Sequence, residues 1–373
     1  MTEGAPVTPD GSSPSARHVG ALDGLRGFAV LLVFCVHAAG NAAAVVAGLD
    51  LGHESFLSLA TWSQRLLFWL QRSHHGVFLF FVLSGYLIGR MWWPQPQSSY
   101  GRFAWRRTLR IYPAFLLSFV ASLLFVRFTG TVVVLDAPRV LGNLLFLNGA
   151  PAAGVAPFNI VTWSLFYEMT FYLVFPLLLL AAARVSAQAA RWIPGVGIVA
   201  PMLLVIAGAD TLVLCWSLLF GGVALAFGGN GAVQLLARIP AVLVVVLYLS
   251  VTTSALLDGL PQTVGIIAFG TVAALVVAQC VAGGNAIAAA LTWRPLVRLG
   301  RISYSFYLLH WMIVVLVARA VDVPGEAWGP LPTTLVIFGG GFVLSATAAT
   351  VSWWLTERPY FGWVRAGSAA NRT

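Results

Sequence analysis

Apolar stretches long enough to cross a bilayer recur along the whole 373-residue chain. A spanning helix needs about 20 mostly apolar residues, because a helix rises about 1.5 Å per residue and the hydrocarbon core is about 30 Å thick. Ten stretches meet or approach that length: residues 25–47, 75–92, 111–128, 162–182, 194–208, 211–228, 240–257, 263–282, 303–320 and 334–355. The sequence therefore predicts an all-α, polytopic membrane bundle of about ten transmembrane helices.

The composition agrees with a membrane bundle. Hydrophobic residues make up 59% of the chain and charged residues only 9%, whereas soluble domains carry about 25% charged residues. We expect a disordered N-terminal tail at residues 1–20, a membrane domain at 21–363 and a C-terminal tail at 364–373. The three cysteines lie in apolar segments without paired spacing, so neither a disulfide framework nor a metal site is expected.

The arginines predict the orientation in the membrane. With the N-terminus in the cytoplasm, sixteen of the 21 basic residues fall in cytoplasmic loops or ends, and the opposite side takes most of the acidic residues. Membrane proteins keep their basic loops on the cytoplasmic side. We therefore predict a multi-pass cell-membrane protein with both termini cytoplasmic. The excess of Arg, Ala, Gly and Val is typical of a high-GC bacterial coding background.

A histidine deep in the first apolar stretch is the leading candidate for a catalytic group. His37 lies eleven residues after Arg26, which is about 16 Å along a helix and near the middle of the membrane. Glu168, about six residues into the helix expected at 162–182, lies at a similar depth. Ionisable groups at this depth need partners and tend to mark functional sites. We expect Glu168 to orient His37 as a base, the alternative being a purely structural pair.

Further polar groups leave two interpretations each. His310 could line a cavity or only bond a backbone carbonyl, and His74 and His75 could belong to a site or only be solvated. Ser84 could line a ligand path or serve close helix packing. The basic cluster could clamp phosphate groups of a cytoplasmic ligand or anchor the protein to lipid phosphates. That cluster comprises Arg102, Arg106, Arg107 and Arg110.

Several motifs occur in a fixed order along the chain. They are Leu22–Gly27 followed by His37, Phe80–Ile88, Arg106–Pro113, Trp163–Glu168, Gly300–Trp311 and Glu357–Pro359. In this order they resemble the acyltransferase-3 family of integral-membrane O-acyltransferases, and the resemblance covers nearly the whole chain. Many members carry a C-terminal esterase-like domain. This chain resembles the stand-alone form, because it ends too early for such a domain.

The resemblance implies transfer of an acyl group, commonly acetyl, from cytoplasmic acyl-CoA to a hydroxyl of a sugar-containing acceptor. Such acceptors are lipid-linked or surface glycans, or glycosylated metabolites such as macrolides. The catalytic residues expected are His37 and Glu168. The acyl-CoA contacts expected are Arg26, Arg106, Arg107 and Arg110. The supporting residues expected are Asp23, Ser84, Tyr304 and His310. Acyl-CoA enters as a co-substrate, and we expect no bound cofactor, metal, nucleic acid or protein partner.

Two questions stay open from the sequence. His37 could act as a general base on the acceptor hydroxyl, or could itself take the acyl group and pass it on. The rival function is a proton-coupled exporter of a glycan or small metabolite, in which His37 and Glu168 would form a proton relay.

Overall fold

The computed structural model describes residues 14–51, 53–72, 75–93, 99–130, 135–256 and 261–362, without the side chains of residues 14–19, 254–256 and 323–327. In these ranges the regular structure is helical and no strand occurs, which confirms the predicted all-α class. Of the N-terminal tail predicted at 1–20, residues 1–13 lie outside the described residues, as does the C-terminal tail predicted at 364–373. Residues 14–20 belong to α1, because a helix formed in the adjoining apolar stretch extends at little cost.

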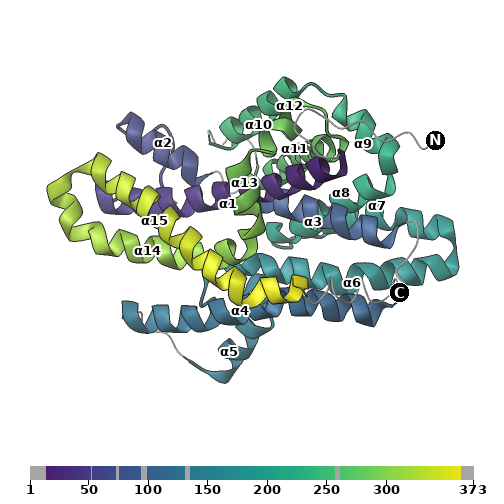
Figure 1. The fold of residues 1–373 in the computed structure, drawn as a ribbon, viewed down its shortest axis with the longest axis horizontal. Helices are drawn as coiled ribbons and strands as arrows, with labels where there is room; N and C mark the ends of the chain where they lie inside the picture. Colours follow the sequence, from purple (N-terminus) through teal and green to yellow (C-terminus); the bar gives the residue numbers. More distant parts are fainter. Residues whose placement is uncertain are drawn as a thin grey trace, which may run out of the picture.

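Fifteen α-helices make up the described part of the chain (Figure 1). They are α1 (Pro14–Ala47), α2 (Trp62–Gln71), α3 (Gly76–Trp92), α4 (Tyr100–Thr129), α5 (Ala137–Leu144), α6 (Trp163–Val185), α7 (Ala187–Ile206), α8 (Leu214–Phe227), α9 (Gly229–Ala237), α10 (Ala241–Leu256), α11 (Gln262–Ala282), α12 (Ala286–Leu291), α13 (Arg294–Arg301), α14 (Ser303–Trp328) and α15 (Pro330–Ser352). A π-helical turn, Trp353–Glu357, continues α15.

Eight helical segments of the described chain are long and apolar enough to cross a membrane. They are Gly20–Ala47, Trp62–Trp92, Tyr100–Thr129, Ile160–Val185, Ala187–Ile206, Gln262–Ala282, Ser303–Asp322 and Pro330–Gly362. The pair Thr211–Phe227 and Gly229–Ala237, bent by 107°, makes a ninth if it counts as one span. The sequence predicted about ten, and the difference is α10, which is apolar but shorter than the others.

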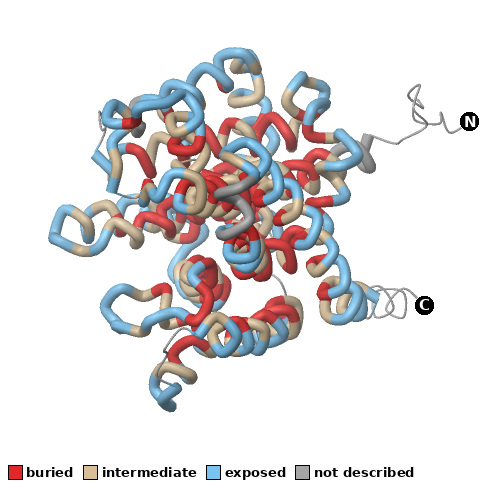
Figure 2. The backbone as a smooth tube through the Cα atoms, turned by 90° about the vertical axis from the view of Figure 1, so that its left-hand side faces the viewer, coloured by how far each residue is buried: buried red, intermediate tan, exposed pale blue. Residues whose placement is uncertain are grey.

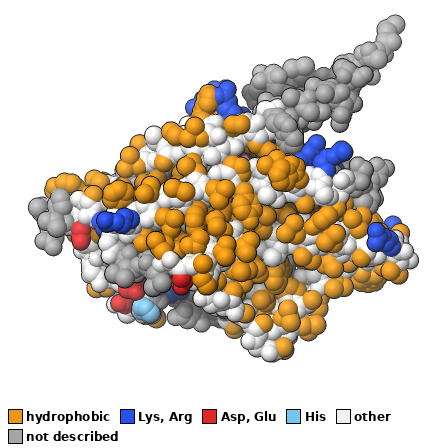
Figure 3. All heavy atoms as spheres, turned by 90° about the horizontal axis from the view of Figure 1, so that it is seen from below, with side chains coloured by type: hydrophobic (Ala, Val, Ile, Leu, Met, Phe, Trp, Pro, Cys, Tyr) orange, Lys and Arg blue, Asp and Glu red, His pale blue; other side chains and the backbone are white. Residues whose placement is uncertain are grey.

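The outer surface has the character of a membrane protein. Large apolar side chains on α4, α6, α7, α10 and α15 stay exposed, and Figure 3 shows one face on which apolar side chains cover the centre while charged ones lie toward the edges. A water-soluble protein rarely exposes so much contiguous apolar surface. Buried residues gather in the middle of the bundle (Figure 2).

Helix α1 lies in the centre of the bundle. It packs against α2, α3, α11, α12, α13, α14 and α15. Two glycines let its backbone approach α13 directly: a Cβ on Gly27 would collide with the Leu296 carbonyl, and a Cβ on Gly300 would collide with the Asp23 carbonyl. The Leu22–Gly27 motif therefore holds the first turns of the span tightly in place, and with them Asp23 and Arg26.

Candidate active site

Three arginines converge on a cavity of about 100 Å³ between α1, α3, α4, α6 and α14. Arg26 comes from α1, whereas Arg107 and Arg110 lie three residues apart on one face of α4. The Arg26 guanidinium lies 3.4 Å from the Asp23 carboxylate, one turn earlier in the same helix. Guanidinium groups bind phosphate and carboxylate groups with paired hydrogen bonds, so this arginine cavity is suited to an anionic ligand.

Aromatic rings hold the two α4 arginines in position. The Arg107 guanidinium carbon lies 5.2 Å from the centre of the Tyr172 ring, and that of Arg110 lies 5.1 Å from the centre of the Phe361 ring. Such cation–π contacts restrict the side chain without neutralising it. Arg106, predicted with them, is not among the residues that line the cavity, because it lies about 100° around the helix from Arg107.

Glu168 belongs to the wall of the arginine cavity. Its Oε1 accepts hydrogen bonds from the Ser84 hydroxyl, at 2.6 Å, and from the Tyr172 hydroxyl, at 2.7 Å. Ser84 lies in α3, and Glu168 and Tyr172 lie one turn apart in α6. The carboxylate therefore ties α3 to α6 inside the cavity, and all three side chains line it.

The predicted pairing of Glu168 with His37 is not formed. The hydrogen bonds of Glu168 go to Ser84 and Tyr172, and the His37 ring lies beside the ring of His310, with ring centroids 5.2 Å apart. His37 lines a second cavity, together with Arg72, His75 and Gln262. The estimate from sequence compared depths only, and equal depth does not say which helix faces point at each other.

His310 in α14 is fully buried beside His37. Its Nδ1 lies 2.8 Å from the Tyr307 carbonyl and 3.1 Å from the Phe306 carbonyl. Since a carbonyl only accepts, Nδ1 carries the hydrogen. Among the described residues, Nε2 of His310 has no hydrogen-bond partner. In the neutral ring this Nε2 is an acceptor, so it can take a hydrogen bond from an adjacent donor.

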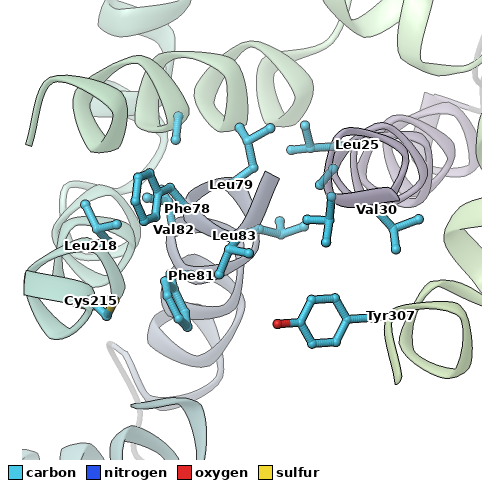
Figure 4. Close-up of a cluster of buried hydrophobic side chains, with 14 of the residues drawn as sticks. Leu25, Val30, Phe78, Leu79, Phe81, Val82, Leu83, Cys215, Leu218 and Tyr307 are labelled. Carbon is cyan, nitrogen blue, oxygen red and sulfur yellow. The ribbon is translucent and has the colours of Figure 1, made fainter. Parts of the chain in front are cut away.

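Tyr307, one turn before His310, lines both cavities. Its hydroxyl donates to the Val161 carbonyl at 2.6 Å and lies 2.8 Å from the Ser164 hydroxyl, which therefore serves as donor to it. Figure 4 shows the side chain reaching from α14 toward the apolar side chains of α3. Tyr307 is thus part of the wall between the arginine cavity and the cavity that contains His37.

Comparison with known proteins shows the family of the chain. Residues 19–350 match the family called acyltransferase domain, Acyl_transf_3. The chain belongs to this acyltransferase family. It is 26% identical over 333 residues to acyltransferase MdmB of Streptomyces mycarofaciens, an alignment that covers 81% of this chain and 80% of that protein. No solved structure matches. The resemblance inferred from the ordered motifs is therefore confirmed, and the chain is a membrane acyltransferase.

Most predicted site residues of the acyltransferase line one of two cavities, whereas Asp23, Arg106 and His310 line neither. Those at the arginine cavity are Arg26, Ser84, Arg107, Arg110, Glu168 and Tyr304. At the other cavity His37 has His310 as its neighbour, and His75 also lines it, whereas His74 lies outside the described residues. Within the described part of the chain, no three or more His, Cys, Asp or Glu residues cluster so that they could hold a metal ion.

Sequence reasoning assigned no role to Tyr307, Tyr172 or Glu357. Glu357 is buried in the π-helical turn after α15 and accepts a hydrogen bond of 2.7 Å from Ser305. Ser305 lies next to Tyr304, whose hydroxyl donates to the Ile111 carbonyl of α4. Both Tyr307 and Glu357 lie inside motifs that suggested the acyltransferase family, and that was the only sequence signal for them.

Proposed function

We propose that this acyltransferase moves an acyl group, first of all acetyl, from cytoplasmic acyl-CoA to a hydroxyl of a sugar-containing acceptor. The observation that carries this proposal is the arrangement of two cavities along α1. One contains three arginines, the other contains His37, and Tyr307 belongs to the walls of both. Arg26 and His37 are eleven residues apart, about three helical turns. An anionic donor with a long arm suits this spacing.

The arginine cavity would bind the donor. Arg26, Arg107 and Arg110 would contact the phosphates of acyl-CoA, which is a co-substrate and not a resident cofactor. Asp23 and Glu168 offset part of the positive charge: Asp23 accepts a hydrogen bond from Arg26, and Glu168 accepts one from Ser84 in the cavity wall. The pantetheine arm would then lead the thioester past Tyr307 toward His37.

At His37 two routes have the same outcome. In the first, His37 takes the proton of the acceptor hydroxyl while the hydroxyl oxygen attacks the thioester carbon. The C–S bond then breaks, and the departing CoA thiolate receives that proton from His37. In the second, a nitrogen of His37 attacks the thioester, CoA leaves, and the acceptor hydroxyl then takes the acyl group and returns a proton to the ring. In both routes His310 Nε2 would orient His37 by accepting a hydrogen bond from its ring, which lies beside it.

We also propose ten spans with both termini cytoplasmic, in a bacterial cell membrane. Counting α10 and the bent pair α8–α9 as one span each brings the number to ten. This topology puts Arg26, Arg107 and Arg110 at cytoplasmic ends of their helices, in keeping with the preference of arginine for that side. The His37 cavity then opens toward the outer side, where Arg72 and Gln262 line it.

The test uses the purified full-length protein in lipid nanodiscs with radiolabelled acetyl-CoA and an envelope extract from a strain that lacks the gene. We expect release of the CoA thiol and transfer of label to an alkali-labile ester, and loss of both with His37→Ala. Absence of thiol release and of label with the wild-type protein contradicts the proposal. Transport of a solute that depends on a proton gradient and not on acyl-CoA would favour the exporter instead.

A further inference from the structure

A third cavity, an apolar crevice, lies beside the His37 cavity. Its walls come from α1, α3, α10, α11, α12 and α13. The lining is almost entirely aliphatic or phenyl, with side chains such as Val244, Val272, Val276 and Ile287. Polar side-chain atoms enter this lining from two residues, His75 and Tyr248. A lining of this kind offers few hydrogen bonds to a polar ligand and favours hydrocarbon.

The crevice reaches the lipid-facing surface of the bundle. Two of its lining residues on α10 are half exposed, Val245 at 48% and Leu249 at 46%. The neighbouring residues of α10, Leu243, Val246 and Leu247, are exposed and apolar as well. A surface of this composition faces hydrocarbon and not water. A ligand in the crevice therefore arrives sideways from the bilayer, which excludes a ligand that is dissolved only in water.

The same crevice adjoins the cavity that contains His37. His75 and Phe269 line both spaces, and their rings stack on each other. These two side chains therefore form part of the wall between the two spaces. On the other side of these rings the His37 cavity offers polar groups, among them His37, Arg72 and Gln262. A polar space and a hydrocarbon space thus meet at one stacked pair of rings.

We propose that the apolar crevice binds the hydrocarbon chain of a lipid-linked sugar whose acceptor hydroxyl lies in the His37 cavity. This inference rests on the proposed acyl transfer and names the acceptor class. The polar head and the apolar chain of such a molecule match the two adjoining spaces, and its diffusion in the bilayer matches the opening on α10. An ordinary bilayer lipid also has a chain, but its head lacks the sugar hydroxyls that the polar groups around His37 can bind.

The first test measures binding and needs no turnover. The probe is a dodecyl glucoside with a photoreactive diazirine in its alkyl chain, added to the full-length protein in nanodiscs. We expect crosslinks in α10, α11 and α12 that excess dodecyl glucoside suppresses and added phosphatidylglycerol does not. Crosslinks elsewhere overturn the proposal. Equal suppression by phosphatidylglycerol means that the crevice holds bilayer lipid only, which also overturns it.

The second test blocks the crevice from its exposed rim. Val245→Trp and Ala290→Trp place a large ring in the opening, and both positions are exposed, so the core stays intact. The matched control is Val246→Trp, which lies next to Val245 on α10 and outside the crevice. We expect the two blocking variants to weaken crosslinking of the dodecyl probe at least about tenfold, because burial of its chain is lost. The control should change it by no more than about twofold.

Kinetics separate this inference from the proposed function. With acetyl-CoA and either dodecyl or butyl glucoside as acceptor, the blocking variants should raise KM for the dodecyl compound and leave KM for the butyl compound within about twofold. If the blocking variants raise KM equally for both acceptors, or for neither, the result contradicts binding of the acceptor chain in the crevice. If no glucoside leads to thiol release while the crosslinks appear as expected, the transfer reaction of the proposed function fails and the chain-binding site stands.

Discussion

The imidazole rings of His37 in α1 and His310 in α14 lie side by side, with their centroids 5.2 Å apart. Backbone carbonyls of Phe306 and Tyr307 hold the hydrogen of His310 on Nδ1, which leaves Nε2 as the acceptor. A second histidine therefore lies beside His37, whereas the carboxylate that its depth suggested bonds to Ser84 and Tyr172. In the proposed mechanism His310 would act through His37 as a positioning residue.

Replacing His310 should lower the rate and spare donor binding. We expect His310→Ala to reduce kcat about 10- to 100-fold, a part of what general-base catalysis contributes, while KM for acetyl-CoA stays within about twofold. His310→Asn keeps a side-chain N–H near the two carbonyls and should recover part of the rate. The control is Met312→Leu, a volume-conserving change in the same helix away from both cavities. A rise in KM equal to the fall in kcat contradicts a role at His37.

The arginine cavity predicts effects on the donor alone. A hydrogen bond to a charged group contributes about 1.5–3 kcal/mol, so Arg107→Ala and Arg110→Ala should each raise KM for acetyl-CoA about 10- to 150-fold. Lysine at either position should restore only part of this, because it lacks the paired donors of a guanidinium. Arg102→Ala, an exposed arginine of α4, serves as the control. If Arg102→Ala raises KM for acetyl-CoA as strongly, then general surface charge and not the arginine cavity explains donor binding.

Ser84 and Glu168 should behave as one unit. The 2.6 Å hydrogen bond between them links α3 to α6, and each single variant, Ser84→Ala or Glu168→Ala, removes it. In a double-mutant cycle we expect a coupling of about 0.5–3 kcal/mol, measured on thermal stability and on KM for acetyl-CoA. Additive effects of the two substitutions would mean that the hydrogen bond contributes neither to thermal stability nor to donor binding. Tyr172→Phe, which removes the second hydrogen bond to Oε1, should show the same kind of coupling with Glu168→Ala.

Much of the fold and part of the site could be predicted from the sequence. Apolar length was enough to locate the spans, and α10 differed because its helix is shorter than its apolar stretch. The spacing of Arg26 and His37 along one helix was also accessible, since both lie in α1. Periodicity along a single helix carries that kind of information.

Contacts between helices could not be predicted in the same way. Depth in the membrane is one coordinate, and the pairing of His37 with His310 instead of Glu168 depends on the rotation of α1, α6 and α14 about their axes. Helix rotation also decides that Arg107 and not Arg106 lines the arginine cavity. Neighbouring residues of a helix point about 100° apart, and packing determines which face lines the cavity. Tyr307 was missed because its role depends on being next to two cavities at once.

Tyr307 should keep water and the thioester apart until the acceptor is bound. Tyr307→Phe keeps the ring and loses the hydroxyl that bonds to the Val161 carbonyl and the Ser164 hydroxyl. We expect thiol release from acetyl-CoA in the absence of acceptor to rise several-fold. The folded state should be retained, since each of the two hydrogen bonds lost contributes about 1 kcal/mol. The control is Tyr112→Phe, which removes a similar bond to the Leu144 carbonyl away from the cavities. If thiol release without acceptor stays unchanged in Tyr307→Phe, the result contradicts a partition at Tyr307.

We propose that His37 performs the transfer while Arg26, about three turns away along α1, binds the donor together with Arg107 and Arg110 of α4. The most direct measurement compares wild-type protein and His37→Ala in nanodiscs for acceptor-dependent release of the CoA thiol, after binding of acetyl-CoA has been measured for both. We predict equal donor binding within about twofold and a loss of release by a factor of about 100 or more in His37→Ala. Release at the wild-type rate by His37→Ala would contradict the account.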